Sequence, residues 1–280
     1  MSRLRVIAVA GGKGGVGKTQ VAVNLAVIMA DRGLRVLLID GDLTLSNADL
    51  LLDVRPAAGL VDVGLGRVPI EDALTSSAYG VTLLSGAHGE VVGHLGDREK
   101  LALLGALDSL GEHFDAVLVD TASGLSSDGL FFAGAAEEVL VVTTPEPTAL
   151  ADTYATIRAL AKNAGQRKIA LVVNQAADAS IACEVHERLG ILTRRFLGLD
   201  MALAGWIPFD VQVHAAVMRR SPVVASAGRS PASRALRYIA DHVLGQPVAR
   251  ASDLASVKPG IQFFWRHLLG YARVTTAEER

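Results

Sequence analysis

Residues 11–19 read GGKGGVGKT, a glycine-rich stretch that is the most informative motif in the sequence. It follows a short apolar run, Val6–Ala10, and leads into an amphipathic stretch, Lys18–Asp31, so it joins a predicted strand to a predicted helix. Residues 12–19 match the pattern G-x-x-x-x-G-K-[ST], in which backbone N–H groups and a helix N-terminus bind phosphate oxygens. The stretch therefore predicts a phosphate-binding loop in an α/β fold.

The lysine and threonine that end this motif predict the contacts of a bound nucleotide. The amine of Lys18 would reach the β- and γ-phosphates, and the hydroxyl of Thr19 would bind Mg²⁺. A glycine-rich turn without a ligand is the alternative, and the order strand, loop, lysine, threonine, helix argues against it. The nucleotide-binding residues that we expect here are Gly12, Lys13, Gly14, Gly15, Val16, Gly17, Lys18, Thr19 and Gln20.

Apolar runs alternate with longer amphipathic stretches along most of the chain, which is typical of parallel βαβ units. The runs are continuous in Val, Leu and Ile, as expected of strands that helices cover on both faces. The predicted strands are Val6–Ala10, Val36–Asp40, Val81–Leu84, Ala116–Asp120, Val139–Thr143, Ile169–Asn174 and Leu203–Ile207. The predicted helices are Lys18–Asp31, Asp97–Leu110, Ser127–Ala133, Ala149–Lys162, Ile181–Leu189 and Pro231–Leu244. We expect a doubly wound, mostly parallel α/β sheet flanked by helices over residues 1–246.

The composition narrows the class of protein. Half of the 280 residues are hydrophobic, which is enough for a large core and excludes wholesale disorder. Lys and Arg number 27 against 29 Asp and Glu, so we expect no direct DNA binding. A single cysteine, Cys183, excludes a disulfide or an iron–sulfur cluster within one chain. No stretch is long enough to span a bilayer, and we expect a cytoplasmic protein.

Carboxylates close two of the predicted strands. Asp40 and Asp42 follow the run from Val36, and Asp120 ends the run from Ala116. The carboxyl ends of parallel strands share one edge of a sheet, so these side chains should lie beside the phosphate loop. Phosphoryl transfer needs such groups to hold the metal and to orient water. We expect Asp40, Asp42 and Asp120 to bind Mg²⁺ together with Thr19; solvated caps at strand ends are the alternative.

The loop has a lysine, Lys13, in addition to Lys18. With it, the stretch GGKGGVGKT resembles the deviant phosphate loop of the MinD/ParA family of ATPases. The resemblance implies a slow, Mg²⁺-dependent ATPase that binds ATP and ADP and forms a homodimer around two nucleotides. It also implies that Lys13 reaches the partner's phosphates, and that Lys13, Lys18 and Asp42 are the catalytic residues. Asp42 would position the attacking water, and Asp120 would reach Mg²⁺ through water. A solvated charge on an exposed loop is the alternative for Lys13.

Two further segments resemble the family's base-binding elements. Asn174 ends a predicted strand, and the run Ile207-Pro208-Phe209-Asp210 follows another. The resemblance implies adenine contacts from Asn174, Pro208, Phe209 and Asp210. An asparagine at this position is equally well explained as a turn former.

Residues 40–52, 120–124, 145–155 and 207–210 resemble the FlhG branch of the family, also called FleN or YlxH. The resemblance implies regulation of flagellar number and placement together with an FlhF-type GTPase. A flagellar master transcription activator and the flagellar switch (C-ring) proteins are further candidate partners. A MinD-type division-site regulator and a ParA-type partitioning ATPase that binds DNA stay open as alternatives.

The C-terminal segment has a different character. A linker is expected at 247–259, and residues 260–280 are expected to form an amphipathic helix and tail. Its large apolar residues share one side and basic residues occupy the other, which is typical of a helix at a membrane surface. The expected membrane contacts are Ile261, Phe264, Trp265, Leu268 and Leu269. We expect the ATP-bound dimer to bind lipids at the inner face of the cell membrane; docking on the chain's own domain is the alternative.

Overall fold

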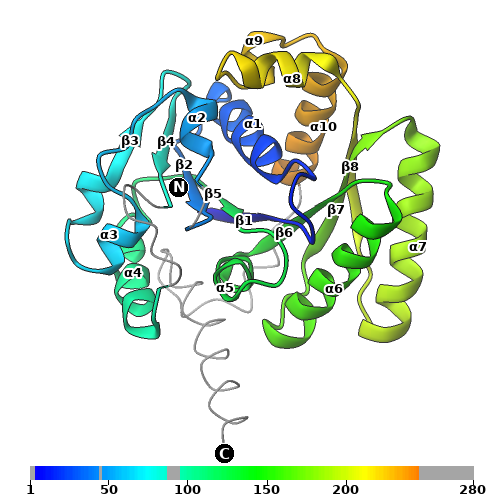
Figure 1. The fold of residues 1–280 in the computed structure, drawn as a ribbon, viewed down its shortest axis with the longest axis horizontal. Coiled ribbons are helices and arrows are strands. Elements are labelled where there is room, and N and C mark those ends of the chain that lie inside the picture. Colours follow the sequence, from blue (N-terminus) through cyan, green and yellow to red (C-terminus); the bar gives the residue numbers. More distant parts are fainter. Residues whose placement is uncertain (1–3, 44–45, 87–94, 246–280) are drawn as a thin grey trace, which may run out of the picture.

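The computed structural model of the protein describes residues 4–43, 46–86 and 95–245 (Figure 1). Over these residues the chain forms an eight-stranded sheet in the order β3-β4-β2-β5-β1-β6-β7-β8. Every neighbouring pair is parallel except β3 and β4, which are antiparallel. The strands are β1 (Arg5–Ala10), β2 (Val36–Gly41), β3 (Leu74–Ser76), β4 (Val81–Leu84), β5 (Ala116–Thr121), β6 (Glu138–Thr143), β7 (Ile169–Ala176) and β8 (Ala202–Pro208). The predicted mostly parallel α/β sheet is confirmed.

Helices cover both faces of the sheet (Figure 1). One face carries α1 (Lys18–Asp31), α2 (Ala48–Leu52), α8 (Val211–Met218), α9 (Val223–Ser226) and α10 (Pro231–Gly245). The other carries α3 (Leu60–Gly64), α4 (Asp97–Ser109), α5 (Ser127–Ala135), α6 (Pro147–Asn163), α7 (Ala179–Leu197) and the 3₁₀ turn η1 (Ile70–Ala73). Both faces of the central strands are therefore buried, which explains why their sequences are continuously apolar.

The position of β1 sets the position of the site. It lies at the middle of the sheet, between β5 and β6, and the chain leaves it first toward β2 and later toward β6. The strand order reverses at β1, and in open α/β sheets ligands bind outside the carboxyl ends of the strands at such a point. The loop of residues 11–17 leaves the carboxyl end of β1 at this place.

The predicted strands and longer helices all occur, and α1 begins and ends as predicted. Most other ends differ by a few residues, but α7 continues to Leu197, eight residues beyond the predicted end at Leu189. The predictions missed α2, α3, η1 and β3 between residues 48 and 76, and α9. These elements span three to five residues, which is too short for a helical or alternating pattern to stand out. Their place is decided by packing against the sheet.

The linker expected at 247–259 and the helix expected at 260–280, with Ile261, Phe264, Trp265, Leu268 and Leu269, lie outside the described residues. Among the helices that the structure describes, none has the length and apolar character needed to cross a membrane.

Candidate nucleotide-binding site

The predicted phosphate loop joins β1 to α1, and Lys18, Thr19 and Gln20 form the first turn of the helix. Two of its glycines are required by their surroundings. A Cβ added to Gly12 would lie 2.2 Å from the carbonyl carbon of Asp152 in α6. Gly17 adopts φ 97°, a left-handed conformation that favours glycine, at the N-cap of α1. The loop is thus packed on the backbone of α6 on one side and turns directly into α1 on the other.

Lys18 is the buried cation of the site. It is only 8% exposed, and its Nζ donates a hydrogen bond to Ser123 Oγ at 2.7 Å. Burial lowers the pKa of Lys18, while the charges of Asp120 and Asp42 act in the opposite direction. The carboxyl ends of β1, β2 and β5 therefore bring these three charged groups together, as the sequence predicted. Ser123 was not assigned a role from the sequence; it follows β5 and reaches back to the loop.

Asp120 is the group best suited to a divalent cation. It is 2% exposed, and its Oδ1 has no hydrogen-bond partner within the described part of the chain. Burial, and then the neighbouring charge of Asp40, raise the pKa of Asp120 well above its usual value, although the Thr19 hydroxyl and Lys18 favour the ionised form. A buried carboxylate oxygen without a partner, next to a threonine hydroxyl, fits the oxygen ligands that Mg²⁺ prefers.

The described residues hold no cluster of three or more His, Cys, Asp or Glu side chains that could bind a metal ion by themselves. Thr19 and Asp120 would be protein ligands of Mg²⁺, and the predicted part of Asp42 in holding the metal stays a prediction.

Both carboxylate oxygens of Asp40 accept hydrogen bonds in this structure, and its predicted part in metal binding stays a prediction. Its Oδ2 accepts hydrogen bonds from Ser46 Oγ at 2.7 Å, Asn47 N at 3.0 Å and Ala48 N at 3.1 Å. Its Oδ1 accepts one from Asp42 N at 3.1 Å. Burial raises the pKa of Asp40 against the effect of these bonds. The carboxylate thus caps α2 and holds the backbone of Asp42.

Asn174, a predicted adenine contact, is tied to the loop. Its Nδ2 donates to the carbonyl oxygen of Val16 at 2.8 Å, and its Oδ1 accepts from Gln175 N at 2.9 Å. The side chain links the end of β7 to the turn before α1. Its adenine contact stays a prediction: the amide keeps a second N–H donor and a second acceptor lone pair beyond these two hydrogen bonds.

The other predicted adenine residues follow β8. Asp210 caps α8 by accepting from Gln212 N at 2.9 Å, and it accepts from Ala232 N, at the start of α10, at 3.0 Å. Phe209 is 73% exposed, and Pro208 ends the strand. Asp210 therefore fixes the loop between two helices, and Phe209 is the residue whose side chain remains available to stack on a base.

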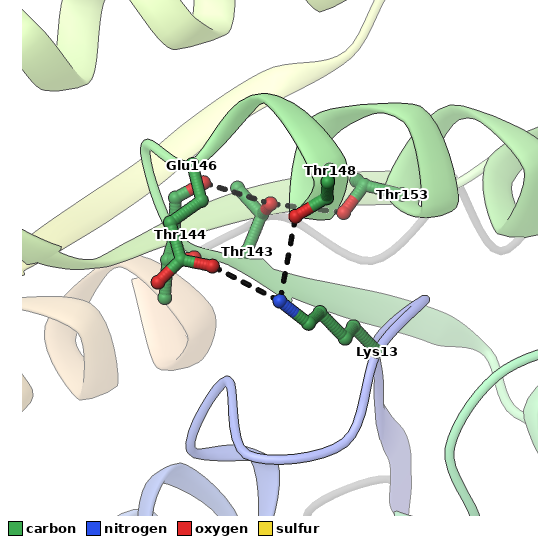
Figure 2. Close-up of polar contacts among 6 residues, drawn as sticks. All are labelled: Lys13, Thr143, Thr144, Glu146, Thr148 and Thr153. Atoms are coloured by element: carbon green, nitrogen blue, oxygen red, sulfur yellow. Dashed lines mark hydrogen bonds and ion pairs between the residues drawn. The ribbon is translucent and has the colours of Figure 1, made fainter.

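Lys13 lies at the outer side of the loop and contacts α6 (Figure 2). Its Nζ forms an ion pair with Glu146 Oε2 at 3.0 Å and donates to Thr148 Oγ1 at 3.4 Å. Its side chain is 43% exposed. No pattern in the sequence indicated this partner, although Glu146-Pro147 is a recognisable helix start.

Comparison with known proteins gives a consistent assignment. The family described as ParA, NUBPL iron-transfer P-loop NTPase, matches residues 3–244. The antiactivator FleN of Pseudomonas aeruginosa is 36% identical over 99% of this chain and 98% of its own length. The flagellum site-determining protein YlxH of Helicobacter pylori is 26% identical over 95% of this chain and 90% of its own length. The septum site-determining protein MinD from Pyrococcus horikoshii, complexed with Mg-ADP, superposes with a TM-score of 0.70 and 28% identity, over 86% of this chain and 96% of that one.

Replacing Asp120 by asparagine tests the buried carboxylate. We expect D120N to unfold at a higher urea concentration than the wild type in nucleotide-free buffer at pH 8. Burial raises the pKa of Asp120, so its ionised form costs stability that a neutral amide of the same size does not cost. Urea unfolding followed by circular dichroism measures the shift. Asp72→Asn, at an exposed aspartate, is the matched control. A D120N midpoint at or below that of this control would contradict the conclusion that the ionised Asp120 carboxylate destabilises the nucleotide-free fold.

Proposed function

Because this chain belongs to the ParA/MinD family of P-loop NTPases, we propose that it is an ATP-driven switch that regulates the number and placement of flagella. The observation that carries the proposal is its 36% identity with the antiactivator FleN over nearly the whole length of both chains. The match with the flagellum site-determining protein YlxH supports the same function. Members of the family are ATPases, so the expected substrate is ATP and the expected product ADP.

ATP would bind with its phosphates in the loop between β1 and α1, where backbone N–H groups and the helix N-terminus point at anions. Lys18 would contact the β- and γ-phosphates, and Asp42, held by the Asp40 carboxylate, would orient the attacking water. Mg²⁺, held by Thr19 and Asp120, would neutralise charge on the phosphate oxygens. Hydrolysis would rest on positioning and electrostatics, without a covalent bond between enzyme and phosphate.

The ATP-bound form would be a face-to-face homodimer in which Lys13 of each copy reaches the phosphates bound by the other. The position of Lys13 supports this role. Its side chain is 43% exposed at the outer side of the loop, whereas Lys18 is buried within its own chain. An amine that crosses an interface must start from an accessible position.

Dimerisation would control where in the cell the protein lies and which partner proteins it binds. The segment 260–280 would place the dimer on lipids at the inner face of the cell membrane, and the chain would return to the cytoplasm after hydrolysis. Two linked amphipathic helices bind a bilayer far better than one, because the second binds at a high effective concentration. The expected partners are an FlhF-type GTPase, a flagellar master transcription activator and the flagellar C-ring proteins.

A MinD-type regulator of the division site is the second candidate function, and the likeness to MinD from Pyrococcus horikoshii supports it. A ParA-type DNA-partitioning ATPase fits poorly with a net charge of −2. An iron–sulfur carrier fits poorly with a single cysteine.

A pulldown from the native cell lysate separates the flagellar function from the division-site function. The bait is the Asp42→Ala variant loaded with ATP and Mg²⁺, which should accumulate as the dimer because hydrolysis is slowed. We expect FlhF-type GTPase and flagellar components among the captured proteins, and fewer of them with ADP in place of ATP. Capture of a division inhibitor without flagellar components would favour the MinD-type function instead.

Substitutions of Lys13 and Asp42 should affect dimerisation and ATP hydrolysis differently. With ATP and Mg²⁺, we expect Lys13→Ala to stay monomeric, because the charge that bridges to the partner's phosphates is lost. Asp42→Ala should dimerise but hydrolyse ATP at least about tenfold more slowly, because the attacking water is no longer oriented. Light scattering after gel filtration and a phosphate-release assay measure the two effects. Lys162→Ala, at an exposed lysine of α6, is the control, and equal dimerisation of K13A and K162A would refute the role in trans.

Deleting residues 260–280 tests the membrane helix. The wild-type chain should co-sediment with anionic lipid vesicles in ATP and much less in ADP, whereas the truncated chain should stay in the supernatant in both. Truncation should leave ATP-dependent dimerisation intact, which serves as the control for folding. Co-sedimentation that is independent of ATP or of the deletion would contradict the proposal.

A further inference from the structure

The contact between Lys13 and α6 is made within one chain. The Lys13 amine lies 3.0 Å from Glu146 Oε2 and 3.4 Å from Thr148 Oγ1, and both partners belong to the start of the same helix (Figure 2). Under the proposed function this amine has a second destination, the phosphates in a partner copy. One ammonium group cannot occupy both positions, so each copy must break its internal contact when the dimer forms.

The packing of the loop explains why the internal contact exists. Gly12 lies against the backbone of α6 so closely that a Cβ would meet the Asp152 carbonyl group. The next residue, Lys13, therefore leaves the loop beside the first turn of that helix. Glu146 is the N-cap residue of α6, but its side chain makes no capping hydrogen bond to the helix. Its carboxylate is instead directed at Lys13.

The contact is weak enough to be exchanged. The side chains of Lys13 and Glu146 are 43% and 60% exposed, and ion pairs so exposed to water contribute little to stability. The carboxylate of Glu146 also lies at the N-terminus of α6, where the helix dipole favours a negative charge. Glu146 therefore remains stabilised after Lys13 has left, which lowers the cost of breaking the pair.

We propose that Glu146 and Thr148 are positioning residues that hold Lys13 within its own chain and compete for it with the nucleotide of a partner copy. This inference rests on the proposed trans role of Lys13. A triphosphate carries more negative charge than one partly solvated carboxylate, so it attracts the Lys13 amine more strongly than Glu146 does. The amine reaches a triphosphate of a partner only when two ATP-bound copies come together. The contact of Lys13 with Glu146 and Thr148 thus opposes dimerisation of copies whose bound nucleotide carries less negative charge than ATP.

The test measures the dissociation constant of the dimer by analytical ultracentrifugation with a non-hydrolysable ATP analogue and Mg²⁺. We expect Glu146→Gln to lower this constant by about 2-fold to 25-fold, the range for losing one exposed ion pair in each of two copies. Thr148→Val should lower it less, and Glu146→Asp should restore part of the wild-type value. Glu187→Gln makes the same charge change at an exposed site on α7 and should leave the constant unchanged.

A purely structural role for Glu146 predicts equal or weaker dimerisation of Glu146→Gln, and that result would overturn the inference. So would tightening that persists in the double variant Lys13→Ala, Glu146→Gln, because the effect must pass through the Lys13 amine. The single variant Lys13→Ala separates failure of the trans role of Lys13 from failure of the competition by Glu146. If it dimerises like the wild type, the trans role fails as well; if it is monomeric while Glu146→Gln matches the wild type, only the competition fails.

Discussion

The site depends on the burial of one ammonium group and several carboxylates at the carboxyl edge of the sheet. Lys18 and Asp120 are 8% and 2% exposed, and neither has enough water around it to be solvated as an ion. Burial disfavours the charged form of both. The hydrogen bond from Thr19 to Asp120, the attraction between Asp120 and Lys18, and the attraction between Asp42 and Lys18 oppose this cost. A site built in this way is poised for a ligand that brings both negative and positive charge, as a nucleotide with Mg²⁺ does.

The parallel sheet is what makes this arrangement possible. Asp40 and Asp120 occupy paired positions on β2 and β5, and β1 carries the phosphate loop on the other side of β5. The two aspartates nevertheless have different surroundings. The oxygens of Asp40 are engaged by the backbone around α2, whereas Oδ1 of Asp120 has no partner in the described part of the chain. Equivalent places in two strands thus support one orienting group and one candidate metal ligand.

The two lysines of the loop, like the two aspartates, have different surroundings. Lys18 begins α1 and is buried beneath the loop, whereas Lys13 lies on the outer side and contacts a different helix. Gly12 allows this difference, because only a residue without a side chain lets the loop pack on the backbone of α6. One lysine is buried within its own chain, and the other forms an ion pair that is exposed to water.

The sequence alone determined the parallel sheet, the phosphate loop, and the clustering of Asp42 and Asp120 with Lys18. These features follow from local patterns: continuous apolar strands, a spaced glycine motif, and acids at strand ends that a parallel sheet must bring to one edge. The short elements between residues 48 and 76 were missed, because no periodic pattern develops over so few residues. The contacts of Asp40, Ser123, Asn174 and Lys13 are visible only in the folded chain. Each contact depends on which backbone or side-chain group lies opposite across the fold, and no local pattern records that.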